Sequence, residues 1–360
     1  MTNSPIAPRG AITIRDDGSY DTVPLRSDNV MLGVVQTKVV GIDGDAPAPG
    51  LRANLDYMLR CIDKAQTFGG RCDLLCFHEF PLQGFRLNWN RQQYQNVALE
   101  VASEPFMEIA ARAKKYNCYV TFGSLCKDPS WPRHVFNWQI MVGPQGTVVD
   151  VHWKQRNVRG MFPGSEQFTT TIYDVFHEYV ERYGWDRVVP IARTDIGNIA
   201  MSSVQFEPEL FRCMALKGAE IIVRTATGGC EWEDMRLTSY HNSLYTVIAH
   251  NCLNLGVPNS DFFEETAPKN DWVGRSAIFG PRGDVLAEAD KFETRRVAMI
   301  NMKLFRMKHR LPDVHSSMYA HVYDAYRERY DSGLYSSYLP NTKAEAYQHF
   351  EGIARWKHYW

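Results

Sequence analysis

Three polar residues, each placed after a strand-like run or beside one, have the chemistry needed to cleave an amide bond. Glu79 follows the run CDLLCFH, Lys154 ends the alternating run VVDVHWK, and Ser202 lies in a turn before a predicted helix. Such cleavage needs a nucleophile, a general base and a positive group beside the oxyanion. Taken singly, each residue is an ordinary strand-end, surface or turn side chain. Their order along the chain is what favours a catalytic interpretation.

The neighbouring residues predict how two of these positions are presented. In the run that ends at Lys154, alternation separates two faces, with Asp150, His152 and Lys154 on one and Val149, Val151 and Trp153 on the other. After Ser202, the pair Pro208 and Glu209 is a favourable helix start. The turn that contains the serine is therefore expected near the positive end of that helix.

The elements that must position these residues alternate between β-branched runs and helical segments from residue 29 onward. The expected strands include VMLGVVQTKVV, CDLLCFHEF, CYVTFGSL, NIAMSS, AEIIVRTA and NCLNLGV, and the expected helices cover residues 51–66, 104–116, 208–218 and about 233–249. Gly-Pro-x-Gly turns at 143–146 and 280–283 predict a hairpin in each half. This order predicts an α/β fold with two stacked sheets and helices outside, a four-layer α-β-β-α sandwich.

The combination of these segments resembles the nitrilase (carbon-nitrogen hydrolase) superfamily. The matching features are a Glu followed by P-L-x-G-F, a Lys 75 positions later, and a turn leading into P-E-L-x-R-x-x-A-x-K-G-A-E. FPGSEQF, IIVRTATGG, RLTSYHNSLYTVIAHN and GRSAIFGPRGDVLAEA also agree, and the similarity covers about residues 29–305. The HNSLYTVIAHN segment and the long C-terminal extension are most similar to the aliphatic amidase and formamidase branch. The resemblance implies Glu79 as general base, Lys154 as oxyanion stabiliser and a cysteine nucleophile before Pro-Glu.

The nucleophilic cysteine that the resemblance implies is absent. Counting six residues back from Pro208 gives Ser202, and the sequence FEPE leaves Ser203 as the alternative. Cys213 lies in the following helix, where a packed thiol is expected, and Cys230 has the wrong place in the motif order. A serine hydroxyl must lose its proton during attack, so it is a weaker nucleophile than a thiolate.

A second acid of the amidase branch is also missing. The resemblance implies another glutamate shortly after the lysine, but this chain has QRNVRGMFPG there, and Glu166 comes only later. Two explanations fit the serine: it was introduced to trap a ligand, or the natural chain carries it and has altered hydrolysis. The missing acid favours the natural explanation, because an engineered exchange would leave that acid in place.

Candidate substrate-binding residues follow the next strand. They are Trp232, Glu233 and Tyr245, the last on the expected helix, although packing explains each of them equally well. The resemblance implies a homo-oligomer that pairs through the helices after the nucleophile turn, and it implies no metal or organic cofactor. We divide the chain into an N-terminal extension (1–28), a carbon-nitrogen hydrolase domain (29–305) and an aromatic C-terminal extension (306–360) that packs across the body or a partner subunit.

Composition limits the other functional classes. Forty Lys and Arg against 41 Asp and Glu give a net charge of -1 without a basic run, so no nucleic-acid partner is expected. No apolar stretch reaches the length of a signal-peptide core or a membrane span, so we expect a cytoplasmic protein without membrane insertion. The eight cysteines lie mostly in apolar runs, which favours buried free thiols over disulfides or zinc.

The leading hypothesis is therefore hydrolysis of a C–N bond in a small amide-like substrate. Two alternatives stay open at this point. One is a non-catalytic ligand-binding protein that keeps the pocket without turnover. The other is an acyl-transfer or condensation reaction at the same site.

Overall fold

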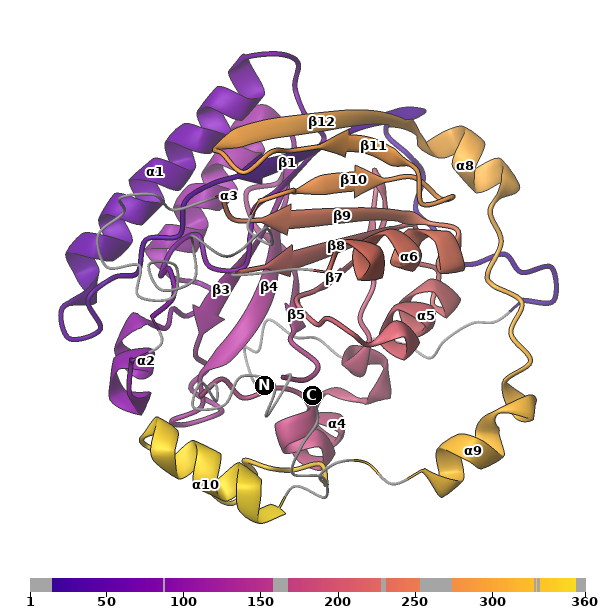
Figure 1. Ribbon diagram of the computed structural model, residues 1–360. Coiled ribbons are helices and arrows are strands. Elements are labelled where there is room, and N and C mark those ends of the chain that lie inside the picture. The colour runs from indigo at the N-terminus through magenta and orange to yellow at the C-terminus, as the bar shows by residue number, and fades with distance from the viewer. Residues whose placement is uncertain are drawn as a thin grey trace.

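Two stacked β-sheets form the centre of the molecule. The computed structural model describes residues 15–86, 88–157, 168–227, 231–252, 274–326, 328 and 331–353. In these ranges two six-stranded sheets lie face to face and helices cover their outer faces (Figure 1). This arrangement confirms the four-layer α-β-β-α sandwich expected from the sequence. Most of the expected strand NCLNLGV lies outside the described residues, as does Cys230.

Each sheet contains three parallel strands flanked by antiparallel ones. The first sheet has the order β12 (Thr294–Asn301), β1 (Asn29–Gln36), β2 (Leu74–Cys76), β3 (Tyr119–Cys126), β4 (Phe136–Val142) and β5 (Val148–Trp153). The second has the order β11 (Val285–Glu288), β10 (Ala277–Phe279), β9 (Tyr245–His250), β8 (Ile221–Ala226), β7 (Gly197–Ser202) and β6 (Ala192–Thr194). β1, β2 and β3 are parallel, and so are β7, β8 and β9. Each trio continues into an antiparallel hairpin through one of the two Gly-Pro-x-Gly turns, so the two halves repeat one pattern.

Helices form the two outer layers and the rim. They are α1 (Pro47–Thr67), α2 (Arg91–Val97), α3 (Glu104–Tyr116), α4 (Phe176–Tyr183), α5 (Pro208–Leu216), α6 (Trp232–Asn242), α8 (Met302–Lys308), α9 (Ala320–Ala325) and α10 (Lys343–Ile353), with 3-10 turns η1 (Tyr173–Val175), η2 (Trp185–Val188) and η3 (Ser316–Met318). α1 and α3 cover the first sheet, and α5 and α6 cover the second (Figure 1). The expected helix at 104–116 has the bounds of α3, which ends at Asn117 in the left-handed conformation that closes many helices.

The helix expected at about 233–249 is not one helix, so that part of the sequence prediction is wrong. α6 ends at Asn242, Ser243 has a φ of 52°, and β9 begins at Tyr245. The run Tyr-Thr-Val-Ile is rich in residues that favour strands. Its place between β8 and β10 buries it on both faces.

Strand alternation divides the hydrophobic core into layers. On β2, Leu74 packs between the two sheets, whereas Leu75 packs on the side of α1 and α3. On β7, Met201 faces the layer between the sheets and Ala200 packs on the side of α5. Because neighbouring residues of a strand face opposite sides, a polar residue at an inward position must find its partners between the sheets.

The cysteines of the described ranges are free thiols, as expected. Cys72, Cys76, Cys118, Cys126 and Cys252 are buried, and Cys61 is partly buried. Burial raises the pKa of Cys76 to about 12, so it is a neutral thiol at physiological pH. Cys213 is exposed on α5, so the prediction of a packed thiol at that position is wrong.

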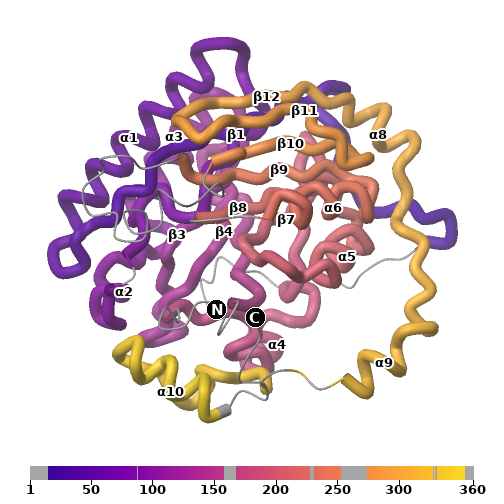
Figure 2. The backbone as a smooth tube through the Cα atoms, in the orientation of Figure 1, coloured from indigo at the N-terminus to yellow at the C-terminus, as the bar shows by residue number. Residues whose placement is uncertain are grey.

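Both terminal segments lie against the outside of the sandwich. In the N-terminal arm, the Tyr20 hydroxyl donates to Glu220 Oε1 at 3.0 Å. The chain leaves the sandwich through α8, which includes the expected boundary at residue 305, and runs around the rim through α9 to α10 (Figure 2). Residues 331–353 contact the body again, where the Gly333 amide donates to the Tyr173 carbonyl at 2.9 Å. Within the described ranges, every helix is too short or too polar to cross a membrane.

Gly123 on β3 allows a close backbone contact beneath Glu79. A Cβ at Gly123 would lie 2.2 Å from the Glu79 carbonyl oxygen. We therefore expect Gly123→Ala to lower the free energy of unfolding by about 1–3 kcal/mol, since the neighbouring backbone must move. Thermal or urea denaturation measures this loss. Gly352→Ala on α10 is the control, because a methyl group there would meet nothing within 4 Å beyond its chain neighbours and its own helix backbone. An equal loss in that variant would contradict the prediction.

Candidate active site

Glu79 and Lys154 lie together between the sheets although they come from separate strands. Glu79 follows β2 and Lys154 follows β5. The Lys154 ammonium nitrogen is 3.5 Å from Glu79 Oε1, and each side chain is 9% exposed. The Lys154 amide donates to the Asn137 carbonyl at 3.0 Å, which continues the β4–β5 pairing and fixes the lysine backbone. The structure thus brings together two of the three residues identified in the sequence.

A chain of hydrogen bonds leads to the Glu79 carboxylate from the second sheet. The Thr225 hydroxyl on β8 donates to Gln139 Oε1 at 2.9 Å, and Gln139 Nε2 donates to Asn137 Oδ1 at 3.3 Å. Asn137 Nδ2 in turn donates to Glu79 Oε1 at 2.5 Å. Every donor in this chain points toward Glu79, whose Oε1 accepts the last of these hydrogen bonds. Sequence reasoning missed these residues, although polar Asn137 and Gln139 alternating within the apolar run FNWQIMV were a usable signal.

The two candidate serines differ in their contacts. Ser202 is 1% exposed, its hydroxyl donates to Gln155 Oε1 at 3.0 Å, and its oxygen accepts the Val204 amide at 3.1 Å. Ser203 is 5% exposed, and its hydroxyl has no hydrogen-bond partner among the described residues. Neither serine hydroxyl is hydrogen-bonded to Glu79 or Lys154 in the described part of the chain.

The turn after the serines is held in an unusual backbone conformation. Phe206 has a φ of 56°, which is costly for a bulky residue that is not glycine. Arg156 Nη2 donates to the carbonyls of Gln205 and Phe206, at 3.0 Å each, and the same guanidinium pairs with Glu207. Glu207, which stands between Phe206 and Pro208, is therefore a partner of Arg156.

Arg224 and Asp234 support the same turn from the outer side of the second sheet. Arg224 Nη2 is 2.6 Å from Asp234 Oδ2 and donates to the Val204 carbonyl at 2.9 Å. The Phe206 amide donates to the same Asp234 oxygen at 3.3 Å. The ion pair therefore connects β8, the start of α6 and the turn.

The histidine beside Glu79 in the sequence is neutral. His78 is fully buried, and burial together with His250 lowers its pKa to about 3. It therefore adds no positive charge beside Glu79 at physiological pH. In the ranges that the structure describes, no group of three or more His, Cys, Asp or Glu side chains could hold a metal ion.

The described contacts of the three candidate substrate-binding residues are with residues other than this pair. Trp232 begins α6, where its ring is 4.9 Å from the Phe279 ring, and the exposed Glu233 pairs with Arg236 at 2.9 Å. Tyr245 is the first residue of β9, so the prediction that it lies on a helix is wrong. It pairs with Ile221 at the start of β8, whereas Ser202 pairs with Arg224 farther along that strand. None of the described contacts of these three residues reaches Glu79, Lys154 or the serines.

The chain is similar to one family model and to several solved structures. The family model described as carbon-nitrogen hydrolase matches residues 32–308. An amidase from Nesterenkonia sp. AN1, solved as a double mutant with acrylamide, is 15% identical, with a TM-score of 0.59 over 84% of this chain and 100% of that chain. A carbon-nitrogen hydrolase from Helicobacter pylori is 17% identical, with a TM-score of 0.64 over 82% of this chain and 98% of its own. Saccharomyces cerevisiae Nit3, a member of branch 10 of the nitrilase superfamily, is 18% identical, with a TM-score of 0.56 over 81% and 98%.

Substitution of Asp234 tests how much the Arg224–Asp234 ion pair stabilises the turn. Asp234→Ala would leave the Arg224 guanidinium, whose side chain is 1% exposed, without its carboxylate partner. We expect the free energy of unfolding to fall by about 3 kcal/mol, measured by urea denaturation. The matched control is Glu233→Ala on the same helix, whose side chain is 65% exposed, with an expected change within about 0.5 kcal/mol. Equal losses in the two variants would show that the pair does not stabilise the turn.

Proposed function

Because the chain belongs to the carbon-nitrogen hydrolase family of the nitrilase superfamily, we propose that it hydrolyses a C–N bond in a small amide-like substrate. The observation that supports this proposal most directly is the buried pair of Glu79 and Lys154, with 3.5 Å between the ammonium nitrogen and Oε1. A buried carboxylate that accepts hydrogen bonds can take a proton from a nucleophile, and a neighbouring ammonium group can stabilise an oxyanion. The two serines supply candidate hydroxyl nucleophiles.

The reaction proceeds in two steps through an acyl-enzyme ester. A serine oxygen attacks the amide carbon while Glu79 accepts the hydroxyl proton, and Lys154 stabilises the negative oxygen of the tetrahedral intermediate. Glu79 returns the proton to the departing amine as the C–N bond breaks. Glu79 then takes a proton from water as the water oxygen attacks the ester, and it gives that proton to the serine oxygen as the C–O bond to serine breaks and the carboxylic acid leaves.

Ser203 is the better-placed of the two nucleophile candidates by its contacts. Ser202 is the position that the family resemblance implies, but its proton goes to Gln155 and its oxygen already accepts the Val204 amide. Ser203 has a buried hydroxyl with no described partner, as expected for a group whose partner is a bound substrate. We therefore propose Ser203 as the attacking residue, with Ser202 capping the turn.

Serine-to-cysteine variants test both the reaction and the choice of serine. We expect Ser203→Cys to raise kcat/KM on short amides by at least about tenfold, because a thiol near a cation is more readily ionised than a hydroxyl. Ser202→Cys is the matched control and should show no such gain. Adding Glu79→Gln should lower the activity of the faster variant by about 100-fold or more. Release of ammonia or amine is the measurement.

The opposite pattern would correct the proposal in a defined way. A gain in Ser202→Cys alone would return the nucleophile to Ser202. No gain in either variant, together with no effect of Glu79→Gln, would exclude amide hydrolysis at this site.

One observation favours the second candidate function, a ligand-binding protein without turnover. Neither serine hydroxyl is hydrogen-bonded to Glu79 or Lys154 in the described part of the chain, so the base is not in contact with a nucleophile. Such a protein would bind short amides in calorimetry without releasing product, and Glu79→Gln would weaken that binding. Acyl transfer or condensation would instead give a new covalent product in mass spectrometry, which distinguishes it from both.

We also propose that the chain forms a homo-oligomer through α5, α6 and the segment around α9. Apolar and aromatic side chains of this segment are exposed: Met318, Tyr319, Val322, Tyr323 and Tyr326. The Tyr323 hydroxyl donates to Glu209 on α5 at 3.3 Å, so this surface is continuous with the helices through which the family resemblance implies pairing. Contiguous exposed apolar surface is typical of protein interfaces.

Removal of two of these apolar side chains tests the oligomer. We expect the double variant Tyr319→Ser/Val322→Ser to lower the molar mass measured by light scattering after size exclusion, because the surface loses buried apolar area. The control is Phe68→Ser, which removes a ring that is 70% exposed elsewhere on the surface. A wild-type chain that elutes as a monomer, or a mass that does not change in the double variant, would contradict the proposed interface.

A further inference from the structure

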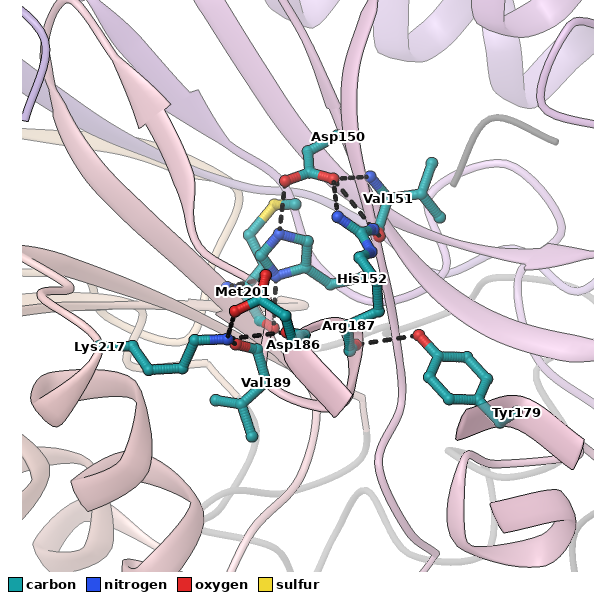
Figure 3. Close-up of polar contacts among 9 residues, drawn as sticks. All are labelled: Asp150, Val151, His152, Tyr179, Asp186, Arg187, Val189, Met201 and Lys217. Atoms are coloured by element: carbon teal, nitrogen blue, oxygen red, sulfur yellow. Dashed lines mark hydrogen bonds and ion pairs between the residues drawn. The ribbon is translucent and has the colours of Figure 1, made fainter. Parts of the chain in front are cut away.

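His152 connects the two sheets at the point where both candidate catalytic segments begin. It lies on β5, two residues before Lys154, and is fully buried. Its Nδ1 is 3.1 Å from the Met201 amide on β7, and its Nε2 is 3.2 Å from Asp150 Oδ2 (Figure 3). Met201 immediately precedes the two candidate serines. One imidazole ring therefore contacts the strand that carries Lys154 and the strand that leads to the nucleophile.

The hydrogen-bond directions define the state of this ring. The Met201 N–H can only donate, so Nδ1 must offer a lone pair and the ring proton lies on Nε2. Nε2–H then donates to Asp150. The Met201 carbonyl is 3.3 Å from Nδ1, a longer contact than that of the amide. The imidazole is thus neutral, and both of its nitrogens are engaged in a fixed orientation.

Arg187 fixes the carboxylate on which His152 depends. Its Nη1 and Nη2 lie 3.1 and 3.2 Å from Asp150 Oδ1, and Nη2 also donates to the Val151 carbonyl at 2.7 Å. The Arg187 carbonyl accepts the Tyr179 hydroxyl of α4 at 2.9 Å. Figure 3 shows Asp150 in contact with both His152 and the Arg187 guanidinium, with Tyr179 at the backbone end of Arg187. The aspartate is therefore paired and hydrogen-bonded at both oxygens.

β5 and β7 belong to different sheets, so no backbone hydrogen bonds of a β-ladder hold them together. On the β6 side, β7 is paired only as far as Ile199, which pairs with Ala192. Met201 lies beyond that pairing and its amide needs another acceptor, since a buried N–H without one is costly. His152 supplies it. The end of β7 is then held by a side chain of the strand that ends at Lys154.

We infer that His152 is a positioning residue that sets the place of the nucleophile turn relative to Lys154. This inference rests on the proposed function, because it gives the turn a catalytic partner to be aligned with. A displacement of about 1 Å between reacting groups can cost about 100-fold in rate. Loss of the ring would let β7 and β5 move apart at the site while the hydrophobic layers keep the fold.

Alkylation of an introduced thiol measures this alignment without knowledge of the natural substrate. The parents are the full-length Ser203→Cys and Ser202→Cys chains, and the probe is iodoacetamide, whose C–I bond is replaced by a C–S bond as iodide leaves. Mass spectrometry of the peptide that carries the new cysteine separates it from the native thiols. A thiol close to Lys154 ionises more easily, so its alkylation rises at lower pH. Lys154→Met identifies the parent in which this dependence exists.

In that parent, we expect His152→Leu to slow alkylation at pH 7 by about tenfold, with the midpoint of the pH profile moving up by about one unit. His152→Gln should lie between the parent and His152→Leu, because its side-chain oxygen can accept the Met201 amide. Tyr179→Phe is the control, since it removes a hydrogen bond at the outer end of the same network. It should lower the melting temperature and leave the pH profile unchanged.

Two results would overturn the inference, and they differ from each other. A Lys154-dependent profile that stays unchanged in His152→Leu, with only a lower melting temperature, would show that His152 is merely structural. If His152→Leu does not fold, an unchanged profile in His152→Gln leads to the same conclusion. If Lys154→Met leaves the pH profile of alkylation unchanged in both parents, the proposed function is contradicted. The inference then fails with it.

Discussion

The burial of Glu79 beside Lys154 is the interaction on which the rest of the site depends. Two charged groups that are almost removed from water cost free energy unless they pair with each other and find further hydrogen bonds. Gly123 lets the Glu79 backbone lie against β3, and Asn137 donates to the carboxylate at 2.5 Å. The β4–β5 hairpin holds the lysine backbone in register. Strands β3, β4 and β5 of the first sheet therefore supply contacts that offset the free-energy cost of burying this pair.

The second sheet contributes through side chains that cross the layer between the sheets. Thr225 contacts Gln139, Ser202 contacts Gln155, and His152 contacts the Met201 backbone. Each contact joins strands that share no ladder, at the end of the sandwich where the candidate catalytic residues lie. The hydrophobic layer farther along the strands fixes the distance between the sheets, and these polar contacts fix their alignment at the site. The candidate site therefore needs residues of both sheets and depends on how the sheets stack.

Polar contacts of Ser202 and of four charged side chains support the turn that follows the candidate serines. A hydroxyl is a stronger hydrogen-bonding group than a thiol, and Ser202 both caps the Val204 amide and donates to Gln155. Arg156, Glu207, Arg224 and Asp234 surround the same turn with ion pairs. A turn fixed by so many polar contacts is well supported, and its Phe206 backbone is held at a positive φ that a less supported turn would relax.

The sequence by itself determined the fold class, the bounds of α3, and Glu79 and Lys154 as candidates, because strand and helix periodicities are local and the two residues follow strand runs in a distinctive order. It failed at Tyr245, where a β-branched run follows a helix without a Gly or Pro to separate them. Trp232 and Glu233 lie at the start of α6, where they contact Phe279 and Arg236, and their role in substrate binding stays a prediction. Only the tertiary structure decided which polar side chains meet across the sheets: Asn137, Gln139 and Thr225 near Glu79, and His152 against Met201. Such contacts join residues that are distant in the chain, and their geometry depends on how two independently formed sheets stack.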